Sequence, residues 1–296
     1  MFKKNLILLG IQIVIFLGRL PLSIRRKLGA YIGDICRIIG IRRKIVERNL
    51  SLAFPKMSEQ EKKTILRRNY QIYGMVISDE FALLSMSQKK MVEWLKLDTI
   101  PKFSKKPIIF CLPHFCAASI IGLRLSLLCK KYTQRAFFHY KPMHNAFWEQ
   151  FYHDLRTKYG ATGMPANDSN TMRKLVHNLK QKGCFLYLPD IDTKRHKSTV
   201  FVPFFSVAES ATTTNLSRLA KITGASVRIL TARITDTGYD LHIDPPLSKF
   251  PGSDLTEDTK RINQIIADYV HVDPAQYFWL HRRFKTHPDR TKNRYA

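Results

Sequence analysis

A histidine follows directly on a short apolar segment near the middle of the chain. The segment Pro107-Ile-Ile-Phe-Cys-Leu-Pro-His114 leads into a second apolar run over residues 115–128. This order predicts a strand, a turn that carries His114, and a helix. Because α/β folds place working groups at the carboxyl ends of parallel strands, His114 is a candidate general base. Ser119 stands five residues further on, at a position where a carboxylate would be suited to orient the imidazole.

A second strand that ends in a polar turn carries two carboxylates, in Tyr187-Leu-Pro-Asp190-Ile-Asp192. Carboxylates two residues apart can point in different directions, so Asp190 and Asp192 are both candidate site residues, one of them directed toward a cap. We expect Asp190 and His114 at the same sheet edge, with side chains within about 12 Å of each other. The apolar and aromatic run over 198–205 is suited to contact with a hydrocarbon chain.

Basic side chains occupy other predicted strand and helix ends. Lys141 follows a predicted strand, Arg156 and Lys158 stand near the end of a predicted helix, and Arg218 lies in a later one. A cation placed in this way can hold a phosphate group or the oxygen of a thioester.

The second part of the chain alternates between strand-like and helix-like segments. Strands are expected at 108–112, 135–140, 185–188, 227–234 and 239–243, and helices at 115–130, 145–159, 168–182, 210–223 and about 255–270. Gly160, Gly183 and Gly224 fall where helices should end. This alternation predicts an α/β fold with a largely parallel open sheet that helices flank on both faces.

The first hundred residues are expected to be helical. A helix over 25–54 has an apolar stripe of Leu28, Ile32, Ile35 and Ile39, a capping box from Ser58 to Glu61 opens a helix to about residue 84, and another follows over 87–97. We expect an anchor helix at 1–22, a helical membrane-facing region at 23–100 and an α/β domain at 101–296.

The N-terminus and the charge both indicate a membrane partner. The apolar run over 5–18 would reach about 21 Å as a helix, short of the roughly 30 Å hydrocarbon core, so a short span and an in-plane helix both stay open. Residues 1–48 hold eleven Lys and Arg against two acidic residues, and the whole chain carries a formal charge of +26. Such a field attracts anionic lipids and acidic proteins. Nucleic acid is the less favoured partner, because no nucleic-acid motif accompanies the charge.

The five cysteines indicate reduced thiols rather than a metal site or disulfides. Their number is odd, they lie in apolar runs, and no pair has C-x-x-C spacing.

Several motifs occur in an order that resembles the bacterial lipid A late acyltransferases of the lauroyl and myristoyl type, over nearly the whole chain. They are Asn49-Leu-Ser-Leu-Ala-Phe-Pro55, the segment that ends in His114, Tyr140-Lys-Pro142, Arg156-Thr-Lys-Tyr-Gly160, Leu188-Pro-Asp-Ile-Asp192, Val200-Phe-Val-Pro-Phe-Phe205, Leu216-Ser-Arg-Leu-Ala-Lys-Ile-Thr-Gly-Ala225 and Gln276-Tyr-Phe-Trp-Leu-His-Arg-Arg-Phe-Lys-Thr286.

The resemblance implies an inner-membrane enzyme with its active site facing the cytoplasm. It would move a fatty acyl chain from acyl carrier protein to a hydroxyl of a phosphorylated glucosamine lipid, without a metal or organic cofactor. Within it, His114 would be the base, and Arg156 would stabilise the oxyanion. Both the carrier protein and the acceptor lipid are anionic, which agrees with the charge of this chain.

This sequence departs from the family pattern at four positions. The family motif is His-x4-Asp/Glu, and Ser119 stands at the carboxylate position; Ser206 and Asn215 replace glycines, and Lys141 replaces an arginine. A serine cannot stabilise an imidazolium by charge, so Asp190 is the best candidate to take the orienting role. The alternatives are a relative that binds anionic glycolipid or acyl carrier protein without turnover, and a hydrolase with Cys116 or Ser119 as nucleophile.

Overall fold

A seven-stranded sheet forms the centre of the protein in a computed structural model, which describes residues 16–98, 100, 106–115, 117–132, 134–166 and 168–296. The strand order is β1-β9-β8-β2-β5-β3-β4, and β6 and β7 form a separate antiparallel pair. The strands are β1 (Leu95–Leu97), β2 (Ile108–Cys111), β3 (Ala136–Tyr140), β4 (Thr162–Pro165), β5 (Cys184–Tyr187), β6 (Thr199–Phe204), β7 (Val207–Thr213), β8 (Ser226–Thr235) and β9 (Gly238–Ile243).

Helices cover both faces of the sheet, as the alternating pattern predicts. Strand β2 pairs in parallel with β5 and β8, and β3 pairs in parallel with β4 and β5, whereas β9 runs antiparallel to β8. The helices are α2 (Leu22–Ile38), α3 (Arg43–Ala53), α4 (Glu59–Ser85), α5 (Gln88–Trp94), α6 (Ala118–Lys131), α7 (Ala146–Thr157), α8 (Thr171–Lys180), α9 (Asn215–Thr223) and α10 (Leu255–Val272), with a 3₁₀ turn η1 (Pro274–Gln276). The largely parallel α/β fold is confirmed.

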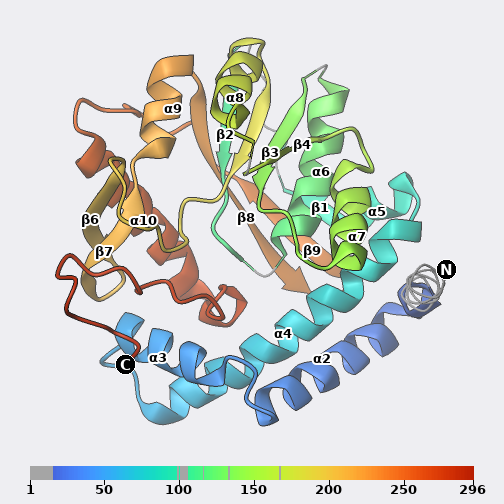
Figure 1. Cartoon of the computed structure of the whole chain (residues 1–296). Coiled ribbons are helices and arrows are strands. Elements are labelled where there is room, and N and C mark those ends of the chain that lie inside the picture. The colour runs from blue at the N-terminus through green and yellow to red at the C-terminus, as the bar shows by residue number, and fades with distance from the viewer. Residues whose placement is uncertain (1–15, 99, 101–105, 116, 133, 167) are drawn as a thin grey trace.

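Strand β2 shows how the two faces share the core. Ile108 and Phe110 belong to one apolar cluster with α4, α6 and α7, and Ile109 and Cys111 belong to another with α8, α9 and α10. All four residues of the strand are buried, which explains why it forms a continuous apolar run in the sequence. Figure 1 shows α4 crossing the end of the sheet toward which the β8 arrow points, with α2 beyond it.

Several segments differ from the expected elements. The helix predicted over 87–97 ends at Trp94, because Leu95–Leu97 form β1 and pair with β9, and no strand is predicted at β4 or β6. The helix predicted over 25–54 breaks into α2 and α3, because Gly40 and Arg42 adopt left-handed backbone conformations at φ 82° and 54°. The helix predicted over 210–223 begins only at Asn215, since β7 continues to Thr213 and pairs with β6. The run over 198–205 is therefore largely a strand; its Phe204 is buried against Tyr277 and Phe284.

Glycines bring α2 and α4 into close contact. A Cβ atom at Gly74 of α4 would lie 1.9 Å from the backbone oxygen of Gly29, and one at Gly33 of α2 would lie 2.1 Å from the backbone oxygen of Tyr70. Helix backbones can approach this closely only where side chains are absent. The pair of helices consequently packs by backbone contact rather than by interdigitating apolar side chains.

Replacing Gly74 with alanine should therefore lower the stability of the protein by about 1–3 kcal/mol, the usual cost of overpacking a tight contact. The matched control is Gly122→Ala in the middle of α6, where a Cβ would meet only the Leu186 side chain at an ordinary 3.6 Å. Thermal unfolding of both variants measures the difference. Equal unfolding temperatures for the two would contradict the close packing.

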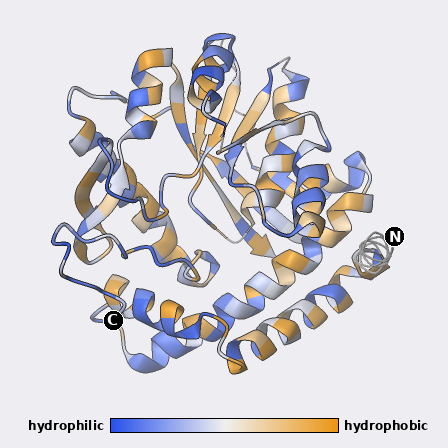
Figure 2. Ribbon diagram, viewed as in Figure 1, coloured by the Kyte–Doolittle hydropathy of each residue, from blue (hydrophilic) through white to orange (hydrophobic). Residues whose placement is uncertain are grey.

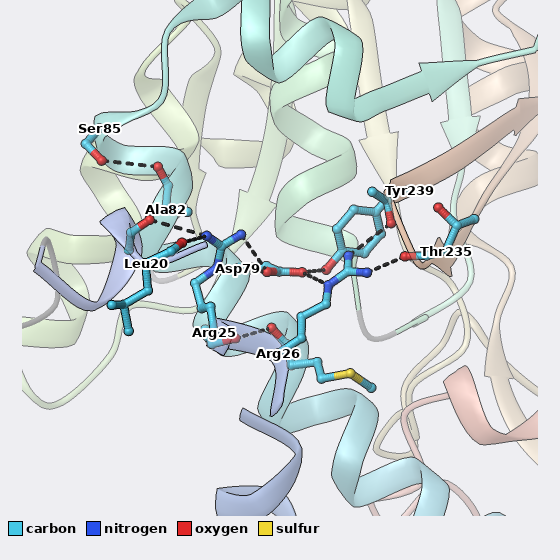
Figure 3. A network of polar contacts seen from close by, with 12 residues as sticks. Leu20, Arg25, Arg26, Asp79, Ala82, Ser85, Thr235 and Tyr239 are labelled. Atoms are coloured by element: carbon cyan, nitrogen blue, oxygen red, sulfur yellow. Dashed lines mark hydrogen bonds and ion pairs between the residues drawn. The ribbon is translucent and has the colours of Figure 1, made fainter. Parts of the chain in front are cut away.

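A buried aspartate joins these helices to the sheet (Figure 3). Asp79 of α4, whose side chain is 0 % exposed, accepts hydrogen bonds from Arg25 at 2.9 Å, Arg26 at 2.8 Å and Tyr239 Oη at 2.8 Å. Arg26 also donates to the backbone oxygens of Thr235 and Gly238 in the β8–β9 turn. This cluster places charged groups of α2 on its inner face.

The outer face of α2 is apolar. Six of its large apolar side chains are between 41 and 68 % exposed, and Figure 2 shows the hydrophobic colour recurring along the helix. They are Ile24, Leu28, Tyr31, Ile32, Ile35 and Ile38. Charges inside and hydrocarbon outside are the reverse of the usual arrangement of a surface helix.

Within the described part of the chain, no helix is both long enough and apolar enough to cross a membrane. The expected anchor at 1–22 lies mostly outside the described residues, which begin at residue 16, so the structure gives no support for it.

Candidate active site

The register of two adjacent strands brings His114 and Asp190 together. Cys111 at the end of β2 pairs with Tyr187 at the end of β5, and each site residue follows three positions later. His114 Nδ1 lies 2.6 Å from Asp190 Oδ1, and the His114 backbone N–H donates to Asp190 Oδ2 at 2.9 Å. The prediction of a shared sheet edge is confirmed.

Burial and hydrogen bonding set the charge of this pair. The Asp190 side chain is 0 % exposed, whereas that of His114 is 19 % exposed. Burial alone would raise the pKa of Asp190, but the charge of His114 and hydrogen bonds from His114 and Tyr277 leave that pKa below its ordinary value. Asp190 is thus ionised and fixes the His114 tautomer that carries its proton on Nδ1, which leaves the lone pair on Nε2.

The segment after η1 holds the histidine from the other side. The Phe278 backbone N–H donates to the His114 carbonyl at 2.8 Å, and the Phe278 ring stacks on the imidazole with centroids 6.1 Å apart. The ring of His281 also stacks on the Phe278 ring, with centroids 6.5 Å apart. Burial, with the charges of His114 and Arg283, lowers the pKa of His281 to about 4, so this second imidazole is neutral at pH 7.

A pocket of about 460 Å³ opens beside His114. It runs between α6 and the strands β3 and β5, and its lining extends along α6 from Ala118 to Ser126, about 12 Å at the rise of an α-helix. Lining residues such as Leu125, Phe138 and Leu186 are apolar, whereas Lys141 and Arg156 add cations to the lining. The shape and chemistry of the pocket suit a hydrocarbon chain with a polar group at one end.

Three aromatic rings hold Arg156 at this pocket. Its guanidinium carbon lies 5.1 Å from the ring centroid of Tyr152, 5.4 Å from that of Tyr140 and 5.8 Å from that of Phe138. Burial lowers the pKa of Arg156, while Tyr152 and Glu80 oppose that shift. A guanidinium keeps its charge under these conditions, so the pocket contains a positioned cation.

Ser119 also lines the pocket, and its hydroxyl is hydrogen-bonded to the carboxyl group of Glu80. Glu80 comes from α4 and is 4 % exposed; Tyr152 Oη donates to its Oε2 at 2.9 Å. The sequence analysis did not select Glu80, because it stands inside a long helix with no local motif around it.

Three residues predicted to bind substrate do not meet at this pocket. Asp192 accepts hydrogen bonds from the backbone N–H and hydroxyl of Thr286 at 2.9 and 2.8 Å. Thr286 belongs to no helix, so Asp192 does not have the capping role considered for one of the two carboxylates. Lys158 Nζ donates to the backbone oxygens of Leu83, Leu84 and Met86, at the end of α4. These contacts use all three of its donors.

Arg218 lies apart from the pocket that His114 lines. Its side chain is exposed on α9, bonds to Thr214 at 2.9 Å, and lines a different groove with Met172 and Ile222. Arg218 and Lys158 therefore contact other parts of the protein than the site around His114.

The arrangement can carry out proton transfer and stabilise a developing negative charge. The buried Asp190 orients the base, and Arg156 supplies a cation at the same pocket. The described residues contain no cluster of His, Cys, Asp and Glu that could hold a metal ion. Cys116, the other nucleophile considered for a hydrolase, lies outside the described residues.

Comparisons with known proteins agree with these features. The family of bacterial lipid A biosynthesis acyltransferases matches residues 1–286. A lipid A biosynthesis lauroyltransferase of Escherichia coli is 30% identical, over 97% of this chain and 94% of the relative. A lipid A biosynthesis acyltransferase of Haemophilus influenzae is 31% identical, over 97% of this chain and 92% of the relative. A lipid A biosynthesis palmitoleoyltransferase of Escherichia coli is 28% identical, over 94% of this chain and 90% of the relative.

Proposed function

Because the chain belongs to the bacterial lipid A biosynthesis acyltransferase family and is an acyltransferase, we propose that it moves a fatty acyl chain from acyl carrier protein to a hydroxyl of a phosphorylated glucosamine lipid. The observation that carries this proposal is the His114–Asp190 pair, which stands beside a largely apolar pocket that also holds Arg156.

His114 acts as the general base in this mechanism. With Nδ1 bonded to Asp190, Nε2 takes the proton of the acceptor hydroxyl, and the hydroxyl oxygen attacks the thioester carbonyl carbon. A carbon–oxygen bond forms, and Arg156 stabilises the negative charge on the carbonyl oxygen. The carbon–sulfur bond then breaks, and the departing thiolate takes the proton from His114.

The acyl chain lies along α6 in this proposal. Transfer of hydrocarbon from water into an apolar cavity is favourable, and the lining of the pocket includes the apolar residues Leu125, Phe138 and Leu186. Lys141, which is exposed at the same pocket, is suited to hold a phosphate of the acceptor lipid.

The outward apolar face of α2 supports the proposal that the protein is attached to the inner membrane, where we propose that its active site faces the cytoplasm. The six exposed apolar side chains of α2 form a surface that water does not favour and that lipid can cover. The charge of +26 would add attraction to anionic lipids and to acidic acyl carrier protein.

Introducing charge into this face should weaken membrane attachment. We expect the double substitution of Ile32 and Ile35 by aspartate to increase the fraction of the full-length chain released from anionic vesicles, with further release at high salt. Ile222→Asp on α9 is the matched control, since Ile222 is 57 % exposed on a different surface. Cosedimentation measures the effect. Equal retention of both variants would show that α2 is not the attachment surface.

Point substitutions test this surface better than deletion of residues 1–22. The backbone oxygens of Gly18 and Leu20 accept hydrogen bonds from Arg25, so the deletion would also disturb the Asp79 cluster.

The function itself is tested by transfer of a labelled acyl group from acyl carrier protein to a lipid A precursor in detergent micelles. The expected product is an acylated lipid that does not form with His114→Ala. Release of free fatty acid in place of the acylated lipid would support the hydrolase alternative. Binding of the lipid or carrier protein without any product would show a protein that binds but does not turn over.

A further inference from the structure

Glu80 is a buried carboxyl group that the mechanism above does not use. Its neighbour Asp79 is committed to Arg25, Arg26 and Tyr239, whereas Glu80 bonds to side chains of α6 and α7. Tyr152 Oη donates to Glu80 Oε2 at 2.9 Å, and Ser119 forms the other side-chain hydrogen bond.

Both residues through which Glu80 can influence the site line the pocket of His114. They are Ser119, by its hydrogen bond, and Arg156, by charge. Arg156 lies one helical turn after Tyr152, and its guanidinium contacts the Tyr152 ring. Glu80 thus interacts with the Ser119 hydroxyl and the Arg156 guanidinium, two groups that line the pocket.

The surroundings of Glu80 favour a change of charge near neutral pH. Burial raises its pKa to about 7, the neighbouring Asp79 adds to this rise, and Tyr152, Ser119 and Arg156 oppose it. Tyr239 of β9 also interacts with Glu80, and the pKa of Tyr239 is raised by burial and by Asp79. A carboxyl group with these neighbours is protonated at lower pH and ionised at higher pH.

We propose that Glu80 is a positioning residue of the active site, acting through Ser119 and Arg156; this inference rests on the proposed acyl transfer. The ionised carboxylate accepts a hydrogen bond from the Ser119 hydroxyl and attracts the Arg156 guanidinium, which fixes both groups at the pocket. The protonated carboxyl loses the attraction for Arg156 and has one oxygen occupied by its own proton. Acyl transfer is therefore faster with Glu80 ionised.

The pH profile of kcat/KM tests this role. Because transfer is slower with Glu80 protonated, wild-type kcat/KM should show a rise of about tenfold as the pH increases through the region around 7 where Glu80 ionises. Glu80→Gln keeps the shape and the hydrogen-bond acceptor but cannot ionise, so its profile should lack this rise. At alkaline pH its kcat/KM should be lower by about tenfold, less than the ~100-fold typical of losing a direct oxyanion donor.

A measurement that needs no turnover makes the inference independent of the proposed function. Infrared difference spectra of the protein titrated from pH 5 to 9 should contain a protonated carboxyl band that disappears around pH 7 and is absent in Glu80→Gln. Ser119→Ala removes a hydrogen bond that lowers the pKa of Glu80, so the band should persist to higher pH. Asp192→Asn is the control for the other carboxyl whose pKa burial raises.

The two measurements separate the possible failures. No acyl transfer by wild type, with the titrating band present and sensitive to Ser119→Ala, would overturn the proposed function and leave the Glu80–Ser119 coupling established. Wild-type transfer whose pH profile is unchanged in Glu80→Gln would overturn the positioning role. A band that is absent, or that Ser119→Ala leaves unmoved, would overturn the coupling itself.

Discussion

Replacing His114 with alanine is expected to reduce kcat/KM for acyl transfer by about 10⁴-fold, and Asp190→Asn by about 10³- to 10⁴-fold. The alanine variant has no group to take the proton of the acceptor hydroxyl. The asparagine variant keeps the shape of the site, but its amide can donate to Nδ1 and so favours the wrong imidazole tautomer. Initial rates with labelled acyl carrier protein measure both losses.

Controls separate this loss from unfolding. Both variants should unfold within a few degrees of wild type, and Arg218→Ala, on a different surface, should retain wild-type rates. Full activity of Asp190→Asn, with loss only in His114→Ala, would show that the 2.6 Å contact is structural rather than catalytic.

The same assay tests the serine at the family's carboxylate position. Since Asp190 already bonds to His114, and Glu80 lies against Ser119, a glutamate at 119 should be neutral or harmful. Two carboxylates brought close together repel, and one of them takes up a proton. A large gain in rate for Ser119→Glu would contradict this and show that Asp190 alone does not orient the base sufficiently.

Replacing Asp79 with asparagine is expected to lower the free energy of unfolding by about 3–5 kcal/mol. The substitution leaves Arg25 and Arg26 buried without a counter-ion, with side chains only 6 and 10 % exposed. Because Arg26 also binds the β8–β9 turn, the loss of stability should be accompanied by faster amide hydrogen exchange in α2 than in wild type. Chemical denaturation measures the first effect and hydrogen exchange the second.

Glu47→Gln is the matched control for Asp79. Glu47 also pairs with an arginine of this helical layer, Arg43 at 2.8 Å, but both side chains are more than 40 % exposed. Exposed pairs of this kind contribute about 0.3–0.5 kcal/mol. If Asp79→Asn were as mild as Glu47→Gln, the buried cluster would not be what holds α2 in place.

Local pattern was enough to predict the parallel sheet and the place of the His114–Asp190 pair. The runs that became β2 and β5 are continuous and apolar because helices cover both faces, and each ends in Pro and a polar residue. Parallel strands align their carboxyl ends, so His114 and Asp190 had to lie near one edge. The capping residues Ser58 and Asp254 likewise act on backbone groups only two or three positions away.

The elements that sequence analysis missed depend on contacts that their own composition does not indicate. The strand β7 replaces the first part of a predicted helix because its residues pair with β6 in a hairpin that turns at residues 205 and 206. Helix α2 has an apolar stripe that would ordinarily face a core. Only the packing of Gly29 and Gly33 against α4, with Asp79 between the two arginines, turns that stripe outward.

The sequence by itself determined the family, the fold class, the charge and the place of His114 and Asp190 at one sheet edge, because each depends on short segments or on composition. The tertiary structure decided that Asp190 contacts the imidazole of His114 directly. It also decided that Lys158 binds backbone oxygens of α4 and that Asp192 binds Thr286, so neither of them lines the pocket. Glu80, finally, is hydrogen-bonded to Ser119 at the wall of the pocket. The physical reason is distance: Glu80 and Ser119 are 39 positions apart in the sequence, and only the crossing of α4 over the sheet edge brings their side chains into hydrogen-bonding contact.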